Sequence, residues 1–122
     1  MQLAADIVVS LIALLHVYIL VLEMFLWDKP AGLRAFRQTL EVAQASKTLA
    51  ASQGLYNGFL AAGLGWGVSL GPGGSSVKIF FLGCVLAAGV YAGLTAARKI
   101  LFIQALPAAV GLVLVLAARL SS

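Results

Sequence analysis

The sequence predicts an all-α integral membrane protein, a four-helix bundle whose spanning helices form a single transmembrane domain over residues 1–122. The chain is 62% hydrophobic and only 10% charged, whereas soluble domains carry about a quarter charged residues. A helix that crosses a ~30 Å hydrocarbon core needs about 20 apolar residues. The apolar stretches of this chain have that length, and charged or turn-forming residues separate them.

The first span is predicted at residues 7–27, interrupted only by His16 and Glu23. It stops at Asp28, Lys29 and Pro30, and proline does not fit a helix interior. No Lys or Arg precedes this stretch and no small-residue cleavage site follows it. We therefore expect the first span to be retained rather than removed as a signal peptide.

The second span is predicted at residues 49–70, before a glycine- and proline-rich turn at residues 71–76. The next 40 residues or so are apolar except around Arg98 and Lys99, and a single helix of that length would reach about 60 Å. Each of these charges would also cost about 2.5–3.5 kcal/mol at mid-membrane. A hairpin with Arg98 and Lys99 at the interface avoids both problems, which gives spans at residues 79–97 and 100–118.

The connection at residues 29–47 is predicted to be an interfacial amphipathic segment. Apolar residues recur there at helical spacing with charged residues between them. Alternatively, Thr39 caps a helix that continues into the second span.

Lys and Arg counts predict the orientation of the chain. Six of the eight Lys and Arg residues lie in the first loop (residues 29–47) and in the third loop (residues 98–99). Basic residues of short loops concentrate on the cytoplasmic side of a membrane. We therefore expect a multi-pass protein of the inner (plasma) membrane with both termini outside the cytoplasm. Basic residues scattered in this way do not form the clustered face that nucleic-acid binding requires.

Polar residues within the spans are the candidate functional residues, because burying them in lipid is costly. Taking midpoints near residues 17, 60, 88 and 109, we place His16 near the centre of the membrane. The other polar groups fall in the half beside the first and third loops: Glu23, Gln53, Asn57, Tyr91, Thr95 and Gln104. His16 and Glu23, seven residues apart, share one helix face about 10 Å apart.

Two interpretations of this polar half remain open. Interhelical hydrogen bonds, worth about 0.6 kcal/mol each on average, explain Gln53, Asn57, Thr95 and Gln104 adequately. A carboxylate and an imidazole are expensive choices for that purpose, so we also consider a polar cavity with Glu23 at its floor and Lys47 or Lys99 at its rim. Glu23 could then hold or pass a proton.

Three glycine pairs at four-residue spacing predict close helix packing, within the chain or between copies of a homo-oligomer: Gly54 and Gly58, Gly63 and Gly67, Gly89 and Gly93. One Cys and one His do not make an ordinary zinc site. We expect no metal and no cofactor.

Four segments resemble the domain-of-unknown-function 1304 family of small bacterial membrane proteins. They are ALLHVYILVLEMFLW at 13–27, AASQGLYNGFLAAG at 50–63, FFLGC at 80–84 and KILFIQALP at 99–107. The resemblance implies a four-span inner-membrane protein and no established activity. Thr39-Leu40-Glu41 departs from the family's pattern, in which Thr-Pro-Glu begins a helix.

The leading functional hypothesis is binding or transport of a small polar or amphipathic molecule. His16 and Glu23 would be the ionisable pair, with Gln53, Asn57, Tyr91 and Gln104 as hydrogen-bonding partners. A second hypothesis is a membrane enzyme acting on a lipid-like substrate, with Glu23 and His16 as acid and base. The ~10 Å between them and the lack of a recognisable nucleophile count against it. A third is an accessory subunit of a membrane complex.

Overall fold

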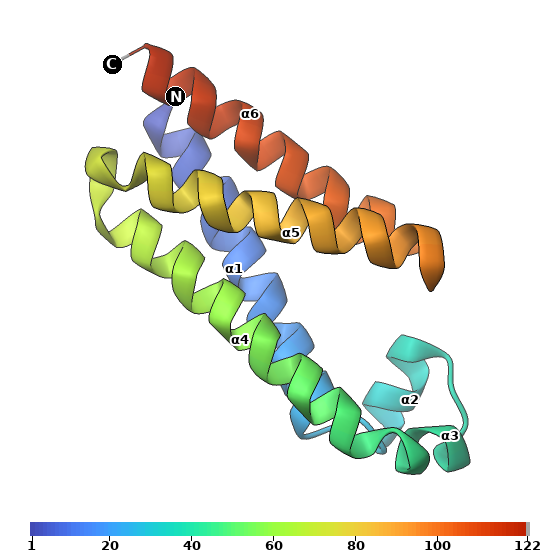
Figure 1. Ribbon diagram of the computed structural model, residues 1–122. Coiled ribbons are helices and arrows are strands. Elements are labelled where there is room, and N and C mark those ends of the chain that lie inside the picture. Colours follow the sequence, from blue (N-terminus) through green and yellow to red (C-terminus); the bar gives the residue numbers. More distant parts are fainter. Residues whose placement is uncertain (122) are drawn as a thin grey trace. The chain divides into compact units, whose positions relative to one another are not determined.

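The structure, a computed structural model, describes residues 1–121. All regular elements over these residues are helices (Figure 1), which confirms the all-α class. The chain divides into two compact units. One comprises residues 1–13 and the chain from Ala62 onward, and the other comprises Leu14–Ala61.

Three segments of the described chain are long and apolar enough to cross a membrane. The first is α1 (Gln2–Met24), the second is Gly71–Thr95, and the third is Leu101–Leu120. The second segment contains a 3-10 turn (Gly71–Gly74) and α5 (Ser75–Thr95). The third contains a π-helical turn (Leu101–Ala105) and α6 (Leu106–Leu120). Helices of this length and apolar composition are typical of an integral membrane protein.

The second predicted span corresponds to α4 (Lys47–Ser69), a helix of 23 residues. It is as long as α1 but is not among the three apolar candidates. Polar residues such as Gln53 and Asn57 and several glycines dilute its apolar character. The helix is therefore present where the sequence predicts it, and its crossing of the membrane stays a prediction.

The first helix begins at Gln2 rather than at residue 7 and ends at Met24 rather than at residue 27. Gln2 and Asp6 extend its start, because the Gln2 amide donates to the Asp6 carboxylate at 3.3 Å. At its end, the backbone N–H groups of Phe25 and Leu26 both donate to the carbonyl of Val21. Glu23 is consequently the second-last residue of α1, about 15 Å along the axis from the helix midpoint.

The connection between α1 and α4 contains two short helices, α2 (Pro30–Phe36) and α3 (Leu40–Ala45). Pro30 occupies the first turn of α2, where its missing N–H is not needed. Arg37 then ends α2 in a left-handed conformation, with φ of 50°. Thr39 caps α3 by accepting a hydrogen bond from Val42 N at 3.2 Å. The capping role of Thr39 is thus confirmed.

Ser46 separates α3 from α4, because its φ and ψ of −107° and 9° lie outside helical geometry. The alternative of one uninterrupted helix from Thr39 into the second span is therefore wrong. Leu40 stands at the first position of α3, where proline is common, and the threonine cap begins the helix without it.

Helices α5 and α6 lie side by side in the unit that contains them (Figure 1, gold and red). Gly89 permits the contact, since a Cβ there would meet Ala105 N at 2.8 Å. A Cβ at Gly93 would meet Leu101 Cγ at 2.4 Å. Between the two helices the chain turns around Arg98 and Lys99, as the sequence predicts.

Candidate functional site

Glu23 and Asn57 form the hydrogen bond that joins α1 to α4 in the unit of residues 14–61. Asn57 Nδ2 donates to Glu23 Oε1 at 2.6 Å and to the carbonyl of Gln53 at 3.1 Å. Glu23 is buried, with 9% of its surface exposed. Among the described residues Asn57 is its side-chain hydrogen-bond partner, and neither ion pair of the structure includes it. A carboxyl group with an amide donor and no basic partner is thus held between two helices.

The two helices approach closely here because α4 presents glycine at the contact. A Cβ at Gly54 would lie 2.6 Å from Met24 Cγ and 3.1 Å from Glu23 Cβ. A Cβ at Gly58, one turn later, would lie 2.7 Å from Leu20 Cδ1. This predicted glycine pair therefore sets the backbone separation at which Asn57 reaches Glu23.

His16 and Gln53 occupy different environments. His16 is fully buried, at 0% exposure. Gln53 is exposed, and it contributes its backbone carbonyl rather than its amide to the Asn57 hydrogen bond. The predicted role of the Gln53 side chain as a direct partner of Glu23 thus has no contact to support it.

Tyr91 and Gln104 belong to the other unit. Tyr91 is 72% exposed, and its carbonyl accepts a hydrogen bond from the Thr95 hydroxyl at 2.7 Å. Gln104, in the π-helical turn, donates to the carbonyl of Val85 on α5 at 3.3 Å. The Gln104 hydrogen bond joins two helices, as the packing interpretation predicts, whereas the Thr95 hydrogen bond lies within α5. A cavity shared by Glu23, Tyr91 and Gln104 stays a prediction.

The two predicted rim lysines are both exposed. Lys47 begins α4 and donates to the Asp28 carboxylate at 3.1 Å. Beside this pair, Trp27 Nε1 donates to Ser46 Oγ at 3.1 Å. Lys47 thus helps to join the end of α1 to the start of α4. Lys99 lies in the turn between α5 and the π-helical turn.

The Asp28–Lys47 ion pair also changes the acidity of Asp28. The hydrogen bond from Lys47 lowers the pKa of Asp28 from its ordinary value of 3.8, and the positive charges of Lys47 and Lys29 act in the same direction. Asp28 therefore stays ionised to a lower pH than an ordinary aspartate does.

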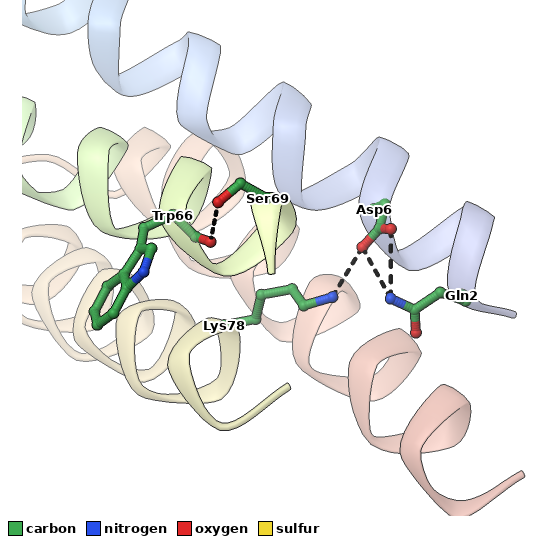
Figure 2. A network of polar contacts seen from close by, with 5 residues as sticks. All are labelled: Gln2, Asp6, Trp66, Ser69 and Lys78. Carbon is green, nitrogen blue, oxygen red and sulfur yellow. Dashed lines mark hydrogen bonds and ion pairs between the residues drawn. The ribbon is translucent and has the colours of Figure 1, made fainter. Parts of the chain in front are cut away.

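A second polar contact, between Asp6 and Lys78, was not predicted as a site. Lys78 in the first turn of α5 is only 1% exposed, and its Nζ donates to Asp6 Oδ1 at 2.9 Å (Figure 2). The Gln2 amide donates to the same carboxylate. The aliphatic part of the Lys78 side chain packs on α4, where a Cβ at Gly67 would lie 2.7 Å from Lys78 Cγ.

Neither Lys78 nor Asp6 was among the candidate residues that the sequence predicts. A usable signal was present, because the starts of the first and third spans would lie at the same membrane face in the predicted four-span bundle. Opposite charges at such positions are candidates for an ion pair. The buried Lys78 and its partner Asp6 therefore form a polar contact outside the group of residues that the sequence singled out.

One comparison with known proteins identifies a family. The model of the family described as "Protein of unknown function (DUF1304)" matches residues 10–116. No curated protein and no solved structure matches the chain. The matched range includes His16, Glu23, Asn57 and Lys78 and extends over most of the sequence. This chain belongs to the DUF1304 family.

Proposed function

We propose that this protein binds or transports a small amphipathic or polar molecule, with Glu23 and Asn57 as the polar end of the binding site. The observation that carries the proposal is the 2.6 Å hydrogen bond between Asn57 Nδ2 and Glu23 Oε1. It fixes one carboxyl oxygen and leaves Oε2 without a hydrogen bond from the described residues. A ligand that donates a hydrogen bond or carries positive charge complements that oxygen.

The place of Glu23 on its helix supports an amphipathic ligand. Glu23 is the second-last residue of a candidate span, so it lies toward a membrane interface rather than at the midplane. An amphipathic molecule lies in a bilayer with its polar group at that depth and its apolar part in the hydrocarbon region. Such a molecule would reach the carboxyl group without crossing the membrane core.

The Asp6–Lys78 ion pair supports four spans in one transmembrane domain. If α1 crosses the membrane, the residues after Met24 lie on the opposite side from Asp6. Lys78 contacts Asp6 at 2.9 Å, so the chain has to cross back before residue 78. The 23 residues of α4 reach about 35 Å, which is sufficient for that crossing.

Lys and Arg distribution supports an orientation within this arrangement. Residues 29–47 and 98–99 hold six of the eight basic residues and would lie in the cytoplasm. Both termini would then lie outside it, and the membrane would be the inner (plasma) membrane of a bacterium.

Self-association through the glycine pairs has little support. Each of the three pairs packs against another helix of the same chain: Gly54 and Gly58 on α1, Gly63 and Gly67 on α5, Gly89 and Gly93 on the π-helical turn. A homo-oligomer would therefore need a different surface. The enzyme hypothesis also lacks a supporting contact, since His16 and Glu23 are about 10 Å apart along one helix.

The test uses three eight-carbon probes that differ only in their polar group: octylammonium, octanol and octanoate. Thermal unfolding of the protein in lipid nanodiscs is measured with each probe. We expect octylammonium to raise the unfolding midpoint most and octanoate least, because like charges repel. Glu23→Gln keeps an acceptor for Asn57 but removes the charge, and should abolish the difference between the probes.

Asp28→Asn is the matched control, because it removes a carboxylate that already has a lysine partner. It should leave the ranking of the probes unchanged. If wild type and Glu23→Gln respond alike to all three probes, Glu23 has no role in ligand binding and the hydrogen bond to Asn57 is part of the packing.

A further inference from the structure

The segment between α1 and α4 is a defined structure that follows directly on a candidate span. Gly32 of α2 packs on the end of α1 so tightly that a Cβ there would overlap the carbonyl oxygen of Leu26. The centroids of the Trp27 and Phe36 rings lie 4.8 Å apart. Trp27 Nε1 also donates a hydrogen bond to the hydroxyl of Ser46, just before α4. These contacts fix the position of α2 relative to the end of α1.

Three basic side chains of this segment are exposed and belong to neither ion pair of the described residues: Lys29, Arg34 and Arg37. Arg34 lies two residues after Gly32, about 200° around the helix, so it projects from the face opposite the packed one. Lys47 differs from these residues, because Asp28 already binds it. We call Lys29, Arg34 and Arg37 the basic face.

Apolar side chains accompany the basic face. Phe36 is 36%, Leu40 48% and Val42 54% exposed. A segment with exposed apolar side chains, basic residues and a nearby tryptophan is typical of the membrane interface. Since α1 ends at Met24, the segment begins where a spanning helix leaves the hydrocarbon region.

We infer that the basic face binds the phosphate groups of anionic phospholipids in the membrane leaflet beside it. The guanidinium groups of Arg34 and Arg37 match phosphate oxygens in pairs, and Lys29 adds a point charge. The apolar side chains beside them suit the acyl chains of the same lipid. The lipid is already present at this depth, whereas a soluble anion would have to compete with it. This site is separate from Glu23 and goes beyond the proposed function.

The test measures which lipid surrounds Trp27. Trp66 is replaced by phenylalanine, so that Trp27 is the single tryptophan, and the protein is reconstituted in bilayers with brominated phosphatidylglycerol or brominated phosphatidylcholine. Bromine quenches a tryptophan that the lipid contacts. We expect phosphatidylglycerol to quench more effectively than its share of the bilayer predicts, by about fivefold for each arginine that binds it.

Variants decide whether the basic face causes this preference. Arg34→Gln with Arg37→Gln should remove most of it, and the lysine pair Arg34→Lys with Arg37→Lys should keep part of it. Lys47→Gln is the matched control, because its partner is Asp28, and it should preserve the preference.

Three results would overturn the inference. The first is equal quenching by the two lipids in the wild type. The second is an undiminished preference in the arginine-to-glutamine pair, measured in samples whose circular dichroism matches that of the wild type. The third is loss of the preference when inorganic phosphate is added at constant ionic strength, which would assign the site to free phosphate rather than to lipid.

Discussion

At the scale of single residues, the structure contains two carboxyl groups with contrasting partners. Asp6 has a buried lysine as its partner, and Glu23 has an asparagine amide. An ion pair with a basic residue neutralises a carboxylate, whereas an amide donor does not. This contrast is the reason for proposing a binding role for Glu23 and a structural role for Asp6.

Replacing Asp6 by asparagine should destabilise the fold by about 2–4 kcal/mol, because it leaves the ammonium group of Lys78 buried without its charge partner. The loss falls toward the lower part of the range for buried pairs, since 25% of the Asp6 side chain is exposed. Replacing both residues, by Asp6→Leu and Lys78→Met, should restore most of that stability. Unfolding by denaturant in detergent micelles measures both, and a double variant as unstable as the single one would contradict this assignment.

The Asp28–Lys47 ion pair should make the stability of the fold depend on pH in the acidic range. Its folded pKa lies below the ordinary value of 3.8, so the stabilisation from Lys47 is present above that value. It is lost as the pH falls through the folded pKa. The unfolding midpoint of the wild type should therefore decrease relative to that of Asp28→Asn below about pH 4. Parallel curves for the two proteins between pH 6 and pH 2.5 would exclude this contribution.

At the scale of elements, glycines determine where the helices meet. The sequence pattern identified the glycine pairs, and the structure gives each a partner helix within the chain. Gly32 was not part of that pattern, because no second glycine lies four residues before or after it. Its contact depends on how the chain turns after Met24, which residue spacing does not reveal.

Gly32→Ala should destabilise the protein by about 1–3 kcal/mol, because the added methyl group overlaps the backbone at Leu26 and displaces α2. Gly65→Ala is the control. A Cβ at Gly65 meets nothing within 4 Å, and alanine favours a helix by up to about 1 kcal/mol. Thermal unfolding of the two variants should shift in opposite directions. A destabilised Gly65→Ala with an unaffected Gly32→Ala would refute this account of the contact.

At the scale of the whole molecule, composition and the lengths of apolar stretches were sufficient to predict the helices. The break at Arg98 and Lys99 followed from the cost of charge in lipid. The first helix begins before the predicted span, at Gln2, because a helix can extend beyond the apolar stretch from which a span is predicted. The ion pair from Asp6 to Lys78 joins residues 72 positions apart, and only packing brings such residues together.

The proposed arrangement of four spans predicts which loops and termini lie on the same side of the membrane. With Cys84 replaced by alanine, single cysteines at Gln44 and Ala97 should react with an impermeant maleimide from one side, and those at Ser76 and Ser121 from the other. If α4 does not cross, Ser76 lies on the same side as Gln44. Labelling of intact cells and inverted vesicles distinguishes the two arrangements.

The most direct test of the central claim is the reaction of Glu23 with the lipid-soluble reagent dicyclohexylcarbodiimide. This reagent partitions into the apolar part of the membrane and reacts there with carboxyl groups through their protonated fraction. The chain contains four acidic residues: Asp6, Glu23, Asp28 and Glu41. Mass spectrometry of the protein in membranes should find the adduct at Glu23, and octylammonium should slow its formation. An unmodified Glu23, or equal modification of all four carboxyl groups, would contradict the claim that Glu23 is a ligand-accessible carboxyl group in apolar surroundings.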